Sequence, residues 1–70
     1  MNLNWHEEKY VHGIVAKHEE FTLNVTGKGY AVMGNNKYVS GFCNGIEDGK
    51  KIATHYLKIM KRNKLEEQSS

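Results

Sequence analysis

The sequence predicts a small α+β domain, in which a three- to four-stranded antiparallel meander sheet is packed by one C-terminal amphipathic helix. A change of hydrophobic period supports this fold class. Between residues 21 and 43 apolar residues tend to alternate with polar ones, as in a strand, whereas from residue 44 onward they recur every three or four positions, as in a helix. The connections between the apolar stretches are short, so consecutive strands are expected to pair directly.

Three strands are predicted in the middle of the chain. The clearest is Phe21–Val25, in which apolar and polar residues alternate strictly. Residues 26–29 contain two glycines, which supply the positive φ of a tight turn, and they lead into a strand at residues 30–33. Residues 34–36 form a second turn, and residues 37–43 form the last strand.

The first twenty residues allow two interpretations. Residues 10–16 read as a further strand, with Gly13 as a weak point or bulge and residues 18–20 as the hairpin loop into Phe21. Alternatively, Asn4 caps a short helix. The strand is favoured because this stretch is rich in β-branched residues and because a glycine destabilises the middle of a helix. Trp5, the only tryptophan, is expected to cover one edge of the core.

Residues 44–65 are predicted to form the helix, with Asn44 as its N-cap and Glu47 completing a capping box. Acidic residues near the start and basic residues near the end suit the helix dipole. The predicted inner side consists of Ile46, Gly49, Ala53, Tyr56, Leu57 and Met60, and the outer side of Lys51, His55, Lys58 and Arg62. Residues 1–65 are therefore predicted to be a single domain, and residues 66–70 a flexible polar tail.

Length and charge restrict the classes of partner. A core built from 70 residues is marginal, which favours a homodimer or a tight partner. The net charge is only +2, but residues 50–64 hold five lysines and one arginine without an acid. Cys43 is the only cysteine, so no internal disulfide forms, and we expect a reducing, cytoplasmic setting. No apolar run approaches membrane-spanning length, and no membrane partner is predicted.

Catalytic and metal-binding motifs begin but are not completed. The segment that starts at His18 resembles the start of a zinc-protease helix, yet Thr22 stands where the second histidine is required. The segment 45–51 resembles a phosphate-binding loop, but Asn44 replaces its first glycine and Lys51 its hydroxyl residue. We therefore predict that the protein is not an enzyme and uses no metal or cofactor.

The overall pattern resembles small domains encoded by phages and mobile elements. It is carried by the N-terminal tryptophan, by the stretch GYAVMGNNKYVSGF and by the closing GKKIATHYLKIM. The resemblance covers most of residues 5–62 and rests on hydrophobic spacing and turn placement. It implies an accessory protein or an inhibitor of a host protein.

The last strand and the helix also resemble the second half of a double-stranded-RNA-binding domain, in which lysines at the helix start meet phosphates. Lys50 and Lys51 match that basic start, whereas Glu47 and Asp48 precede them and the strands are shorter than in that family.

Two functional hypotheses follow. The first is a non-enzymatic protein-binding module, because one helix covers one face of a small sheet and leaves aromatic residues such as Tyr30 and Tyr38 on the other. An acidic protein would then suit the basic helix side. The alternative is a nucleic-acid-binding module that uses this side. The candidate partner-binding residues are Tyr30, Tyr38, Lys51, His55, Lys58 and Arg62.

Overall fold

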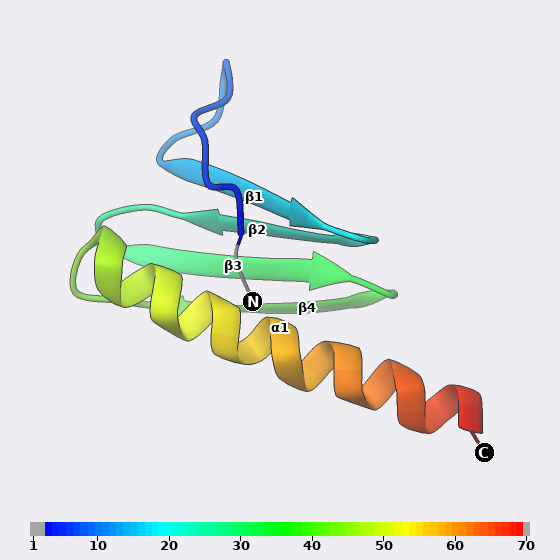
Figure 1. Cartoon of the computed structure of the whole chain (residues 1–70). Helices are drawn as coiled ribbons and strands as arrows, with labels where there is room; N and C mark the ends of the chain where they lie inside the picture. The colour runs from blue at the N-terminus through cyan, green and yellow to red at the C-terminus, as the bar shows by residue number, and fades with distance from the viewer. Residues whose placement is uncertain (1–2, 70) are drawn as a thin grey trace.

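Four strands form a meander sheet in the order β1-β2-β3-β4, each antiparallel to the next, and one helix packs on it (Figure 1). This arrangement confirms the predicted α+β class. The computed structural model describes residues 3–69, and it describes the side chains of residues 3–62. The elements are β1 (Ile14–His18), β2 (Phe21–Val25), β3 (Gly29–Gly34), β4 (Lys37–Phe42) and α1 (Ile46–Ser69).

The core lies between the helix and the two middle strands. Alternation along β2 turns Phe21, Leu23 and Val25 toward the helix, and all three are fully buried. The register places Val32 of β3 opposite Leu23, so it faces the same side. The helix contributes Ala53, Leu57 and Met60 from its predicted inner side. The predicted apolar stripe therefore faces the sheet.

Two-residue loops fix the register of the outer hairpins. Asn35 and Asn36 join β3 to β4, and both have positive φ, as a type I′ turn requires. Glu19 and Glu20 join β1 to β2, and Glu19 has a φ of 56°. Such turns match the twist of the paired strands, and a loop of only two residues does not allow the strands to shift in register.

The helix begins later than predicted. Its first backbone bond runs from the N–H of Gly49 to the carbonyl oxygen of Gly45 (3.0 Å), so Gly45 rather than Asn44 holds the N-cap position. Gly45 has a φ of 103°, which turns the chain from β4 into the helix. The N–H of Asn44 instead donates to Oδ2 of Asp48 (3.0 Å). The predicted capping pair, Asn44 and Glu47, was therefore wrong by one position.

This correction changes the expected effect of substitutions at the helix start. Asp48→Ala should lower the free energy of unfolding by about 0.5–2 kcal/mol, because it removes the acceptor for the Asn44 N–H and a first-turn negative charge. Glu47→Ala is the matched control, since it removes the same charge from the same turn without breaking a backbone contact. Urea unfolding followed by circular dichroism measures both variants. Equal losses, or a larger loss for Asn44→Ala, would contradict this assignment of the cap.

The helix also ends later than the predicted residue 65. It continues to Ser69, through most of the residues predicted to form a tail. Residues 66–68 are two glutamates and a glutamine, which are good helix formers, and neither glycine nor proline stops the helix before them.

The strand predicted at residues 10–16 is present but shifted, since β1 spans Ile14–His18. The segment before it, residues 3–13, forms no helix. Its one strand-like contact is a bridge in which His6 and Val15 exchange N–H···O bonds of 2.9 and 2.8 Å along the outer edge of β1. Leu3 and Trp5 pack against the core, as expected for Trp5. The strand starts only at Ile14 because Gly13, with a φ of 80°, turns the chain immediately before it.

Candidate partner-binding surfaces

The face of the sheet opposite the helix exposes large apolar side chains. Val39 of β4 packs against the core, and successive side chains of a strand point to opposite faces. Tyr38 and Phe42 of β4 therefore lie on the open face. Phe42 is 92% exposed and Tyr38 is 64% exposed. Met33, paired with Tyr38 in the register, is 39% exposed on the same face. We call these three side chains the open-face patch.

Tyr30 does not belong to this patch, which corrects the expectation that it faces a partner. Its register partners are Val25 and Gly41, so it lies on the helix side of the sheet. There its ring stacks on Tyr56, with centroids 5.8 Å apart and planes 14° apart. Partial burial raises the pKa of the Tyr30 hydroxyl, and the neighbouring Tyr56 raises it further. Tyr30 therefore holds the helix against the sheet.

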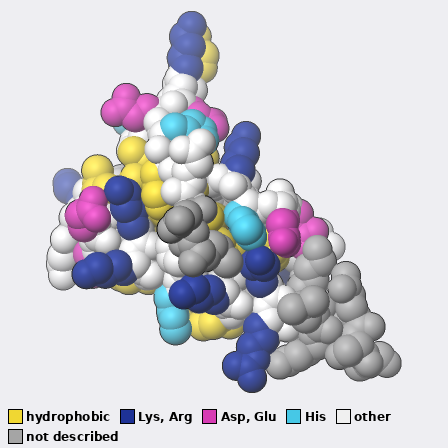
Figure 2. All heavy atoms as spheres, viewed as in Figure 1, with side chains coloured by type: hydrophobic (Ala, Val, Ile, Leu, Met, Phe, Trp, Pro, Cys, Tyr) yellow, Lys and Arg dark blue, Asp and Glu magenta, His cyan; other side chains and the backbone are white. Residues whose placement is uncertain are grey.

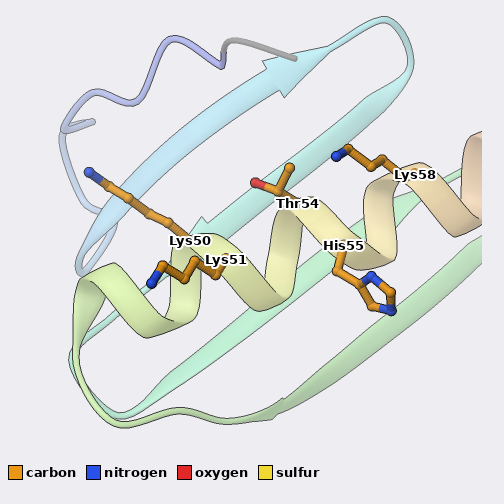
Figure 3. Close-up of a pocket in the computed structure, with 5 residues that line it drawn as sticks. All are labelled: Lys50, Lys51, Thr54, His55 and Lys58. Atoms are coloured by element: carbon orange, nitrogen blue, oxygen red, sulfur yellow. The ribbon is translucent and has the colours of Figure 1, made fainter.

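The outer side of the helix carries a shallow hollow of about 340 Å³. Its lining consists of Lys50, Lys51, Thr54, His55 and Lys58 (Figure 3). Three of these residues were predicted from the helical period as partner-binding, whereas Lys50 and Thr54 were not. In Figure 3, Lys50, Thr54 and Lys58 form one line along the helix, with Lys51 and His55 beside it. We call this set the cationic hollow.

Arg62, the remaining predicted residue, is exposed and lies one turn beyond Lys58, outside the hollow. Figure 2 shows lysine and arginine side chains spread along the helix side of the molecule. The cationic surface is therefore longer than the hollow itself.

The lysines of this surface differ in their ionic partners. Lys50 pairs with Glu47 at 3.2 Å. Lys61 lies 3.5 Å from Oε1 of Glu19 and 2.9 Å from Nε2 of His18, which ties the helix to the β1–β2 hairpin. Lys51 and Lys58 make no ion pair with any residue in the described part of the chain. Their charges remain available to an anionic partner.

Other candidate sites receive no support from the geometry. Within residues 3–62, no three His, Cys, Asp or Glu side chains gather closely enough to hold a metal ion. Cys43 is buried, and its thiol lies 3.5 Å from the carbonyl oxygen of Thr26. No helix in the described chain combines the length and the apolar character needed to cross a membrane.

Comparison with known proteins gives no relative to guide the assignment. No family model, no curated protein and no solved structure matches this chain. The two surfaces must therefore be interpreted from their own chemistry.

Proposed function

We propose that this chain is a non-enzymatic protein-binding module. The observation that supports the proposal best is the open-face patch, in which Phe42 is 92% exposed on the same face of the sheet as Tyr38 and Met33. Exposed aromatic and methionine side chains are typical of the central contacts in protein interfaces, where their burial supplies much of the binding energy.

The cationic hollow gives the module a second contact, suited to an acidic protein. Lys51 and Lys58 lie about two helical turns apart and have no ionic partner within residues 3–62. Positive groups at such a surface speed the encounter with an acidic partner more than they tighten the complex. The resemblance to phage-encoded domains implies that the protein acts as an accessory factor or an inhibitor. The lone cysteine favours action in the cytoplasm.

Nucleic-acid binding is the second candidate, because three lysines line one hollow. Under this alternative the affinity falls by roughly 0.7–0.9 log units per log unit of salt for each phosphate contacted. Glu47, which is paired with Lys50, reduces the positive potential at one end of the hollow and so weakens its attraction for a phosphate backbone.

The two candidates are separated by affinity capture from host lysate with and without nuclease. The baits are the intact chain, a Tyr38→Ser and Phe42→Ser double variant, and a triple reversal of Lys51, Lys58 and Arg62 to glutamate. We expect a protein to be captured after nuclease treatment, to be lost with the serine variant and to be captured more slowly by the triple reversal. The triple reversal should still fold, since exposed charges contribute little to stability.

A reversal of Lys9, Lys17 and Lys28 to glutamate is the matched control, because it changes the net charge equally at exposed positions that are not part of the helix. Capture that depends on nucleic acid, and that is abolished by the reversal of Lys51, Lys58 and Arg62 but kept by the control reversal and the serine variant, would reject the protein-binding function. Capture that the serine variant retains in full would show that the open-face patch is not the contact.

A further inference from the structure

The outer edge of β4 is the least protected feature of the sheet. β4 is the last strand in the sheet order, and the N-terminal segment covers only the opposite edge, where His6 bonds to Val15 of β1. Beyond that bridge, Lys17 places a charge on the β1 edge, a common device against unwanted strand pairing. The stretch from Tyr38 to Phe42 carries no charge at all.

The hydrogen-bond pattern determines which groups β4 offers outward. The N–H of Cys43 donates to the carbonyl oxygen of Lys28 (2.9 Å), which extends the β3–β4 register by one pair. In an antiparallel ladder the bonded pairs alternate, so Gly41, Val39 and Lys37 also bond to β3. The N–H and C=O groups of Tyr38, Ser40 and Phe42 therefore point away from the sheet. These residues also place their side chains on the open face.

We infer that β4 pairs with β4 of a second copy, antiparallel and centred on Ser40. The inference goes beyond the proposed function, because it concerns a second copy of the chain at the edge of β4 and not another protein at the open-face patch. In this register Ser40 lies opposite Ser40 of the second copy, and Tyr38 lies opposite Phe42. All three outward-pointing residues of each copy then exchange backbone bonds. A shift of the register by two residues leaves an aromatic residue of each copy without a bonded partner.

The side chains suit this register. Each Tyr38 meets a Phe42 across the new strand pair, and aromatic cross-strand pairs are among the more stabilising ones. The small Ser40 side chains lie at the two-fold axis, where larger side chains would crowd each other.

The charge distribution also suits self-pairing. Each chain carries a net charge of +2, but the cationic hollow lies on the helix side and the paired stretch of β4 is neutral. The two-fold axis stands perpendicular to the sheet, so the two four-stranded sheets join into one and both helices lie on the same side. The pair then presents two cationic hollows on one surface.

The test is sedimentation equilibrium of the full chain up to millimolar concentration, with Ser40→Lys and Ser40→Thr. Ser40→Lys places two positive charges across the axis and should abolish a concentration-dependent dimer. Ser40→Thr keeps a small neutral side chain and should retain it. Ser40 is exposed and its backbone groups point outward, so both variants keep the monomer fold, as circular dichroism will verify.

Disulfide crosslinking tests the register itself. In a Cys43→Ala background, Ser40→Cys should form a crosslinked dimer under mild oxidation, because a bonded antiparallel pair has Cα atoms about 5.5 Å apart, within disulfide range. Lys17→Cys is the control, since it is exposed on the opposite edge of the same face.

A chain that stays monomeric at all concentrations would overturn the inference, as would a dimer that Ser40→Lys does not weaken. Either result leaves the protein-binding function standing if the Tyr38 and Phe42 double variant still loses the captured partner. Conversely, suppose that the chain forms the β4 dimer while the Tyr38 and Phe42 double variant captures its partner unchanged. That result would confirm the pairing and reject the patch as the contact for another protein.

Discussion

Ala53→Asp should cause the largest loss of folding stability among the substitutions proposed for this chain. Ala53 is fully buried in the cluster formed by the helix and β2, where no polar group in the described chain can pair with a carboxylate. Burying an unpaired charge there should cost about 4 kcal/mol or more. A domain of 70 residues has a free energy of unfolding of about 4–10 kcal/mol, so this single change removes a large part of it.

Far-ultraviolet circular dichroism and thermal melting measure this effect. His55→Asp is the matched control, because it places the same group two residues later on the exposed side of the helix. Burial raises the pKa of the introduced carboxyl, so the folded Ala53→Asp variant favours the neutral acid. Its deficit relative to the wild type should therefore shrink at acid pH and grow as the pH rises. An unchanged melting temperature would show that the apolar stripe of the helix does not face the sheet.

Gly13→Ala should cause the second-largest loss, about 2–4 kcal/mol. Gly13 has a φ of 80°, and a Cβ atom there would overlap the carbonyl oxygen of Val25. Both the backbone conformation and the space therefore exclude a side chain. Because the obstructing atom belongs to the backbone of β2, the strand itself must move to admit a methyl group.

Gly27→Ala is the control for Gly13→Ala. Gly27 lies in the exposed β2–β3 turn, and a Cβ atom there would meet no atom within 4 Å. Urea unfolding should show a clear loss for the first variant and a change within about 0.5 kcal/mol for the second. Similar values for the two would mean that the chain at Gly13 differs from the structure described.

The parts of the fold that depend on local periodicity could be predicted from the sequence. Strict alternation identified β2, and the helical period identified Ala53, Leu57 and Met60 as inward-facing and Lys51 and Lys58 as outward-facing. In both cases the side-chain direction follows from a period that is visible within a few residues. The same rule could have placed Tyr30 correctly, because Tyr30 is two residues from the buried Val32 and shares its face.

The remaining features depend on contacts between distant parts of the chain. No local pattern indicates that His6 pairs with Val15, or that the turn at Gly13 delays the predicted strand until Ile14. The position of the N-cap depended on the φ of Gly45, which the sequence permits but does not require. The exposure of Phe42 depends on which face of the sheet the helix covers. Lys50 and Thr54 join the cationic hollow because packing sets the rotation of the helix.

The contact between Lys61 and His18 has a consequence for the folding reaction. It joins residues 43 positions apart, whereas the hairpins of the meander join neighbours in sequence through short turns. Contacts between close residues form early because little loop entropy opposes them. The hairpins are thus expected to form first, and only transiently, because they have no core of their own. Docking of the helix then becomes the step that makes folding cooperative. If the helix has already docked in the transition state, substitutions on its inner side should slow folding. If it docks afterwards, the same substitutions should accelerate unfolding.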